Sequence, residues 1–264
     1  MVISFQPKVS AERAASVQPG GSSQSEQDPD RQLYLWGGGA GLAGVTLMVV
    51  VAVVVGALGL PDASDVETLR DFADIESGRI AEHLLYLGAL MLFALHVLVL
   101  HRLLRTAHPP AALFGTAIAE FGLVMMAASS LLHVATSPLA DLYTSPDTPS
   151  EDLQSIEYAW HGAQSVFDTM LTTGVLLVPI GIVLLGLAMR SAPAFGPRLT
   201  MLAIGLGTVG IVGATIAVVD PGSAFSAASV VAIVAFHLGT GWRTLTLGNK
   251  AGIDLTDTEP TPVH

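Results

Sequence analysis

The chain has 264 residues, of which 51% are hydrophobic and only 12% are charged, and its formal net charge is −11 at pH 7. A soluble domain needs about 25% charged residues to solvate its surface, so this composition indicates lipid as the surrounding solvent and excludes a second sizeable soluble domain. The acidic balance argues against a nucleic-acid partner, which would need a basic face, and the lack of cysteine excludes disulfides and thiolate metal sites.

The two ends of the chain differ in composition from its middle. Residues 1–31 are rich in Ser, Gln, Pro, Asp and Glu and show no apolar periodicity. Such a segment cannot bury enough apolar surface to fold, so we expect a disordered tail there and a second one over 249–264. The predicted domain organisation is one transmembrane domain, 32–248, between two cytoplasmic tails.

Six long apolar runs follow one another along the chain. Crossing the hydrocarbon layer takes about 20 residues of helix, and each run is long enough. Backbone groups cannot stay unpaired in hydrocarbon, so the runs must be helices, whereas a β-barrel would need shorter alternating segments. The sequence therefore predicts an all-α polytopic bundle of six transmembrane helices, over residues 33–60, 80–104, 111–136, 158–189, 199–219 and 224–247.

Basic residues predict the orientation of this bundle. Cytoplasmic loops of membrane proteins carry an excess of Lys and Arg. In a six-span arrangement one side of the membrane carries Arg31, Arg102, Arg105, Arg190, Arg198, Arg243 and Lys250. On the other side the 137–157 loop has no basic residue, and the 61–79 loop carries Arg70 and Arg79 among six acidic residues. We therefore expect a multi-pass protein of the cell membrane with both termini in the cytoplasm.

Small residues recur along the fifth run at alternating spacings of four and three. A stripe of small side chains lets two helix backbones approach closely, and such packing replaces the hydrophobic drive that lipid does not supply. We therefore expect a compact bundle in which this helix is central. The stripe consists of Ala203, Gly207, Gly210, Ala214 and Ala217.

Three histidines are predicted at one depth, near the outer boundary. His83, His133 and His161 each lie about three residues from the outer end of their run, which is within one helical turn. Because their helices are consecutive, the rings are able to converge on a zinc or copper ion, or two of them on a haem. Nearby carboxylates would orient the rings; they are Glu76, Glu82 and Glu157. The alternative is that histidine simply tolerates the membrane interface.

Four ionisable residues are predicted deeper in the bilayer, namely Glu120, Asp168, His96 and His237. An ionisable group at the bilayer centre costs roughly 2.5–3.5 kcal/mol on insertion scales, so such groups turn inward and usually have a function. We expect them either to relay protons or hold a cation in a transporter, or to form the floor of a ligand pocket. The structural alternative is a buried hydrogen-bond network that fixes helix packing.

A polar stripe marks the outer half of the fourth run. Its members follow the spacing of one helical face, and a polar face inside a membrane must point toward the bundle interior or a water-filled cavity. The inner half is apolar, and Pro179 should kink it. We therefore predict a polar cavity between spans two, three and four that opens outward. The stripe consists of His161, Gln164, Ser165, Asp168 and Thr172.

Enzyme motifs are weak in this sequence. Ser129 and His133 resemble the Ser-x-x-x-His element of membrane zinc hydrolases of the alkaline-ceramidase type, but the last run holds His237 without the second histidine of the expected His-x-x-x-His pair. Phosphate-binding loops, Gly-x-Ser-x-Gly elbows and His-Glu-x-x-His pairs do not occur. We therefore favour a small transporter or a membrane-embedded binding module, for a small solute or a proton, over a metal- or haem-dependent enzyme.

Short hydrophobic motifs resemble those of one known group. They are Leu33–Leu35, Leu103–Arg105, Leu184–Arg190 and Pro197–Leu199. The layout over roughly residues 33–247 is similar to the prokaryotic membrane family known as domain of unknown function 4386. This resemblance implies a six-helix fold without an assigned activity or site residues, so the histidines are a feature of this chain alone.

Overall fold

The computed structural model describes residues 29–59, 67–220, 223 and 225–254, and all its regular secondary structure is α-helical. The helices are α1 (Pro29–Leu58), α2 (Glu67–Leu104), α3 (Pro109–Ala135), α4 (Ser137–Thr144), α5 (Ser150–Met189), α6 (Gly196–Val219) and α7 (Ser226–Asp254). With α3 and α4 counted together, this part of the chain forms six stretches long and apolar enough to cross a membrane. The predicted all-α bundle of six transmembrane helices is confirmed.

Two helices are much longer than a membrane is thick. The 40 residues of α5 span about 60 Å, against about 30 Å of hydrocarbon, and α2 has 38 residues. Both start well before the predicted positions 80 and 158, because their first turns carry charged residues that the apolar pattern does not detect. Similarly, α7 continues to Asp254, past the predicted start of the C-terminal tail. The rest of that tail and residues 1–28 lie outside the described residues.

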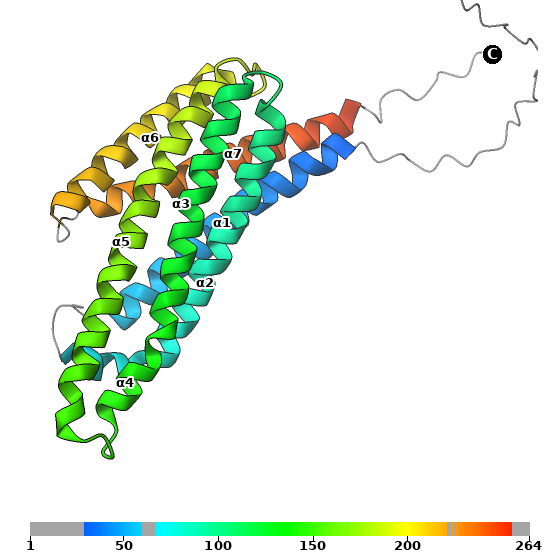
Figure 1. The fold of residues 1–264 in the computed structure, drawn as a ribbon. Helices are drawn as coiled ribbons and strands as arrows, with labels where there is room; N and C mark the ends of the chain where they lie inside the picture. The colour runs from blue at the N-terminus through cyan, green and yellow to red at the C-terminus, as the bar shows by residue number, and fades with distance from the viewer. Residues whose placement is uncertain (1–28, 60–66, 221–222, 224, 255–264) are drawn as a thin grey trace, which may run out of the picture.

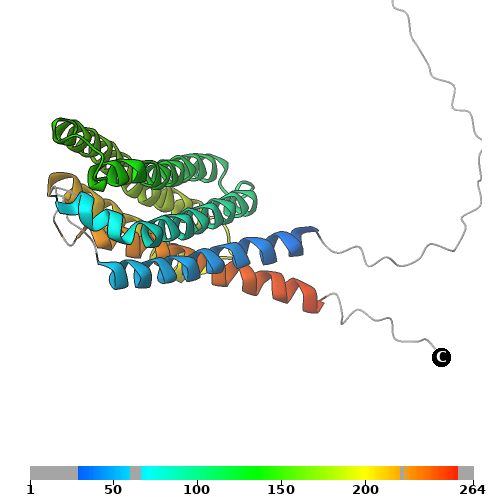
Figure 2. The same cartoon turned by 90° about the horizontal axis from the view of Figure 1, so that it is seen from below.

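The bundle has two distinct ends. Figure 1 shows α4 and the start of α5 at one end, which we call the α4 end. The start of α1, the end of α7 and the α2–α3 turn lie at the other end. Figure 2 shows α1 and α7 running side by side.

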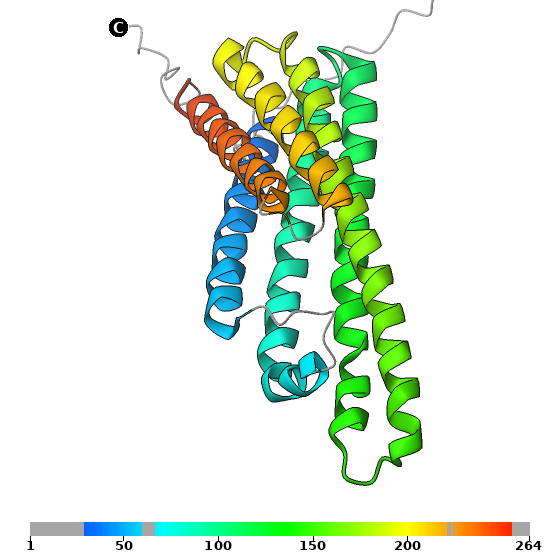
Figure 3. The ribbon, with the colours of Figure 1, turned by 90° about the vertical axis from the view of Figure 1, so that its left-hand side faces the viewer.

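The most extensive helix pair in the described residues is α3 with α5, which lie side by side in Figure 3. Helix α5 also contacts α6 and α7, whereas α6 packs against α5 and α7 alone within the described chain. The prediction that the 199–219 helix is central is therefore wrong, and α5 holds that place. The small-residue pattern correctly identified a packing face on this helix. A helix with one packing face needs neighbours on one side only, so the pattern did not show that the helix is central.

Glycines allow α3 and α5 to approach closely. A Cβ placed on Gly122 would lie 2.8 Å from Val178 Cγ2, and one on Gly181 would lie 2.7 Å from Ala119 Cβ. Both distances are well inside van der Waals contact, so neither position has room for a side chain. Close backbone contact of this kind is the usual source of helix association in lipid.

Pro179 is accommodated by two neighbours of α5, namely α6 and α7. Proline has no N–H, so the carbonyl of Val175, four residues earlier, loses its helical partner. The hydroxyl of Ser229 on α7 donates to that carbonyl at 2.9 Å. On the α6 side, a Cβ on Gly210 would lie 2.7 Å from Pro179 Cγ. The small residues of α6 therefore fit around this proline.

Candidate functional site

A cavity of about 760 Å³ lies among α1, α2, α5 and α7, with two residues of α3 at one end. Helices α1 and α5 stand on opposite sides of it and do not pack against one another within the described residues. Polar and aromatic side chains gather toward the α4 end of the cavity, and we call this group the polar end. It comprises Phe72, Arg79, Glu82, His83, Tyr86, Ser130, His133, Trp160, Gln164, Phe167 and Asp168.

The rest of the lining is aliphatic. Apart from Leu171 on α5, it is formed by two groups that we call the aliphatic wall. The first group is on α1 and consists of Met48, Val49, Val51, Ala52 and Val55, and the second is on α7 and consists of Val230, Val231, Val234, Ala235 and Leu238. A mostly apolar cavity with a few polar groups at one place is the usual design of a small-molecule site.

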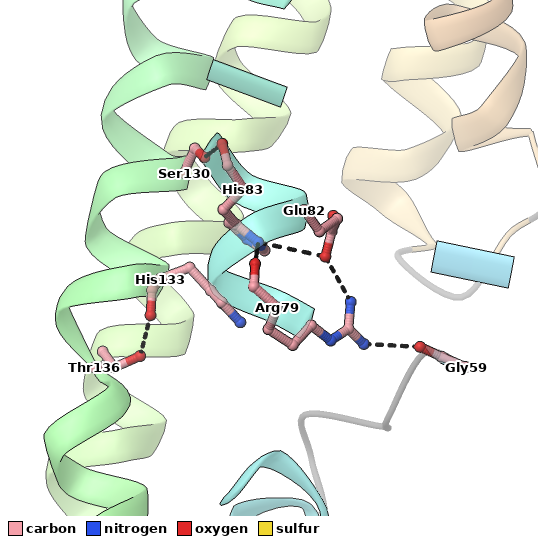
Figure 4. A network of polar contacts seen from close by, with 7 residues as sticks. All are labelled: Gly59, Arg79, Glu82, His83, Ser130, His133 and Thr136. Carbon is pink, nitrogen blue, oxygen red and sulfur yellow. Dashed lines mark hydrogen bonds and ion pairs between the residues drawn. The ribbon is translucent and has the colours of Figure 1, made fainter. Parts of the chain in front are cut away.

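A buried ion pair anchors the polar end, as Figure 4 shows. Arg79 donates from Nη1 to Glu82 Oε2 at 3.0 Å and from Nη2 to the carbonyl of Gly59 at 2.9 Å. The side chains of Arg79 and Glu82 are only 7% and 10% exposed. The Arg79 charge is therefore neutralised inside the protein, and the guanidinium also ties α2 to the end of α1.

The second contact of Glu82 fixes the ring of His83. Nδ1 of His83 lies 3.0 Å from the carbonyl of Arg79 and 3.4 Å from Glu82 Oε2. Because a carbonyl only accepts hydrogen bonds, Nδ1 carries the proton, which leaves Nε2 as the acceptor in the neutral ring. Ser130 on α3 donates to the carbonyl of His83 at 3.0 Å. Glu82 therefore lies where it can orient the ring of His83.

Five rings form a continuous aromatic cluster at the polar end. The ring centroids of His83 and His133 are 4.4 Å apart and nearly parallel, at 10°. His133 lies 5.3 Å from Phe72 and 5.0 Å from Phe167. Trp160 lies 5.3 Å from Phe72 at 67°, in an edge-to-face arrangement. Such distances are in the range of favourable ring contacts.

Several nitrogens of the polar end have no hydrogen-bond partner among the described residues. They are buried in the structure and belong to residues that line the cavity: Arg79 Nε, His133 Nδ1, Trp160 Nε1 and Gln164 Nε2. The indole N–H and the guanidinium N–H are donors only. An unsatisfied buried donor costs about 1–3 kcal/mol, so unpaired groups gathered at one cavity call for an explanation.

The predicted stripe on α5 is divided between the cavity and the surface. Gln164 and Asp168 line the cavity, whereas His161, Ser165 and Thr172 do not. The cavity face of α5 instead follows Trp160, Gln164, Phe167, Asp168 and Leu171. Ser165 is exposed, and its hydroxyl donates to the carbonyl of His161 at 2.9 Å. A hydroxyl that bonds to its own helix in this way can face lipid without an unpaired group.

The deeper residues are not brought to one site either. His96 and His237 are fully buried with ring centroids 5.3 Å apart, but neither lines the cavity, and neither does Glu120. Nδ1 of His96 lies 2.7 Å from the carbonyl of Gly37, and its Nε2 lies 3.0 Å from Thr240 Oγ1. His96 thus connects α1, α2 and α7, as the structural alternative expects.

The ring of His237 has a different environment. It stacks on Phe93 with centroids 3.9 Å apart and planes at 8°, and within the described chain neither of its nitrogens has a hydrogen-bond partner. Glu120 Oε1 on α3 is likewise buried without a partner. Of the four deep residues, Asp168 alone contributes to the cavity, so the relay expected from all four has no common site within the described residues.

The three outer histidines are partly brought together. His83 and His133 stack, but imidazole lone pairs lie in the ring plane, so parallel rings do not aim at one common ion. No group of three or more His, Asp or Glu side chains in the described part of the chain is arranged to hold a metal ion. The zinc, copper or haem site stays a prediction that this geometry does not favour.

We therefore expect the purified protein to be colourless and to hold well under one metal ion per chain. Elemental analysis and a visible absorption spectrum of freshly extracted protein measure both. Stoichiometric zinc or copper, or a haem band, that is lost in a His133→Ala variant would reverse this expectation and support the metal- or haem-binding alternative.

Two walls of the cavity were not predicted from the sequence. The expected cavity lay between the second, third and fourth spans, which are α2, α3 and α5. The structure adds α1 and α7, and it buries Arg79, which the sequence places in an outer loop. The helical spacing of Trp160, Gln164 and Leu171 places them on one face of α5, but nothing in the sequence distinguishes Trp160 and Leu171 from lipid-facing residues. The uniformly aliphatic sequence around Val49 gives no signal either.

Comparison with protein-family models, with curated proteins and with solved structures gives no match for this chain. The resemblance to the domain of unknown function 4386 therefore stays a prediction. Inference about function depends on the cavity itself.

Proposed function

We propose that this chain is a membrane-embedded binding protein whose site is the cavity among α1, α2, α5 and α7. The observation that carries this proposal is an aliphatic cavity of about 760 Å³ whose polar end holds a buried ion pair and unpaired nitrogens. Ligand cavities commonly have volumes of about 300–1,000 Å³. A binding role explains both the volume and the polar groups, which a purely structural network would pair.

The proposal includes the orientation in the membrane. The excess of Arg and Lys at the end of the bundle opposite α4 supports cytoplasmic termini. The polar end of the cavity then lies toward the outer face of the cell membrane. A small transporter uses the same site, with the additional requirement that the cavity opens alternately to both sides.

Filling the cavity tests the proposal. Ala52 and Ala43 are both exposed residues of α1, but only Ala52 lines the cavity. We expect an Ala52→Phe variant to lose most of a small molecule that the wild type retains, because the new ring occupies the site. An Ala43→Phe variant places the same ring outside the cavity and should retain the wild-type amount.

Native mass spectrometry of protein extracted together with its surrounding lipid measures this occupancy directly. The thermal unfolding midpoint shows that each variant is folded. A wild-type protein without any retained molecule, or equal retention in the wild type and the folded Ala52→Phe variant, contradicts a binding role for this cavity.

A further inference from the structure

The cavity is divided into two chemically different parts. Aromatic and hydrogen-bonding side chains form the polar end, and apolar side chains of α1 and α7 form the aliphatic wall. A ligand that fills both parts must itself have two parts. It needs a head that can form hydrogen bonds and a tail that is apolar.

The hydrogen-bonding groups of the polar end favour a ligand head that accepts hydrogen bonds. Trp160 and Gln164 line the cavity and are 1% and 5% exposed, and Trp160 Nε1 and Gln164 Nε2 have no hydrogen-bond partner in the part of the chain that the structure describes. Both groups donate hydrogen bonds. A head group with carbonyl oxygens recovers the free energy that these unpaired donors cost, whereas a head group that only donates does not.

The charges at the polar end favour an uncharged head. The charge of Arg79 is already balanced by Glu82, and the guanidinium also donates to Gly59. The remaining charged candidate in the lining is the carboxyl group of Asp168. A carboxylate or phosphate head would therefore meet a second acid without an unpaired Arg or Lys among the described lining residues to balance it, and its desolvation would be costly.

The shape of the polar end favours a planar head. The ring centroids of Phe167 and Trp160 lie 5.0 and 6.3 Å from the centroid of His133. Aromatic side chains bind flat rings by offset or edge-to-face contact. The same side chains make less extensive contact with a branched or tetrahedral head.

The aliphatic wall indicates that the ligand comes from the bilayer. Val49 and Val231 line the cavity and are still 55% and 64% exposed. Both lie within the membrane-spanning parts of α1 and α7. The cavity is therefore open at the side of the bundle, where an apolar tail can extend between protein and lipid.

We propose that the ligand of this cavity is an uncharged lipid-soluble amphiphile of the quinone class. Its flat carbonyl-bearing ring lies among His133, Trp160 and Gln164, and its apolar tail runs along the aliphatic wall toward the bilayer. This assignment rests on the proposed binding function and specifies the chemical class that the site accepts.

Fluorescence of Trp160 tests the assignment. Trp36 and Trp242 are 77% and 66% exposed and lie outside the cavity, so a Trp36→Phe/Trp242→Phe background leaves Trp160 as the reporter. In phosphatidylcholine nanodiscs, we expect a benzoquinone with a ten-carbon tail to quench this fluorescence saturably. Decanoic acid and decyltrimethylammonium, which carry charged heads on tails of similar length, should not compete.

Two substitutions localise the binding. Gln164→Leu removes one donor of the polar end and should raise the Kd for the quinone about tenfold. Ser165→Ala changes the neighbouring exposed residue, which does not line the cavity, and should leave the Kd unchanged. An unchanged Kd in the folded Gln164→Leu variant, or competition by either charged amphiphile at the concentration of the quinone, overturns the quinone assignment.

The Ala52→Phe variant separates the two proposals. If a charged amphiphile binds the wild type and Ala52→Phe abolishes that binding, the cavity is a binding site and the quinone class is wrong. If the quinone, decanoic acid and decyltrimethylammonium all bind the wild type and the Ala52→Phe variant equally, the cavity does not bind them and both proposals fail.

Discussion

An Arg79→Met variant is expected to lose about 3–5 kcal/mol of folding free energy, because removal of one partner leaves the other as an uncompensated buried charge. The Arg79–Glu82 pair is nearly inaccessible, at 7% and 10% side-chain exposure. The substitution also removes the hydrogen bond from Nη2 to the carbonyl of Gly59, which connects α2 to the end of α1. The thermal unfolding midpoint in a single detergent measures the loss.

The double variant Arg79→Met/Glu82→Leu separates charge from packing. Replacing both members of a buried pair with apolar residues of similar volume is often neutral or stabilising, so we expect it to recover most of the lost stability. Arg102→Met, at an exposed position on the same helix, should change stability by no more than about 0.5 kcal/mol. A double variant as unstable as Arg79→Met would show that the pair acts through its hydrogen bonds rather than its charge.

A Gly122→Ala variant is expected to destabilise the bundle by about 1–3 kcal/mol, the usual cost of overpacking. The added Cβ would lie 2.8 Å from Val178 Cγ2 and 2.9 Å from the backbone nitrogen of Val178. Backbone atoms cannot rotate away as a side-chain end can. The methyl group must therefore separate α3 from α5, which form the most extensive helix pair of the described chain.

Gly205→Ala provides the matched control for this prediction. Gly205 is exposed on α6, and a Cβ there would meet nothing within 4 Å. Alanine has a higher helix propensity than glycine, so this variant should melt at the wild-type temperature or slightly above it. Equal melting temperatures for Gly122→Ala and Gly205→Ala would show that the α3–α5 interface tolerates the extra methyl group.

Part of the cavity face of α5 could be predicted from the sequence. The polar spacing identified Gln164 and Asp168 as inward residues, and both line the cavity. The same spacing included His161 and Ser165, which point elsewhere, because the centre of the cavity face is set by Trp160 and Leu171. Aromatic and aliphatic members of an inward face look like ordinary lipid-facing residues in a membrane sequence, so the pattern located only one edge of that face.

The arrangement of the histidines could also be predicted only in part. Counting residues from the span ends placed His83 and His133 at one depth, and their rings do stack. Depth does not specify direction around the helix, so the count could not exclude His161 from the group. Similarly, the sequence suggested a common deep site for His96 and Asp168, whereas His96 connects α1 and α7 through Gly37 and Thr240.

The sequence by itself determined that the chain folds as six membrane-spanning helices, because a backbone surrounded by hydrocarbon must satisfy every N–H and C=O locally. Only the tertiary structure decided that α1 and α7 form the aliphatic wall and that α6 lies at the edge. The physical reason is that lipid is as apolar as a valine side chain, so hydrophobicity does not sort the faces of a helix into inside and outside. Val51 is 7% exposed and Val53 is 66% exposed on the same helix, and only the packing of the neighbouring helices distinguishes them.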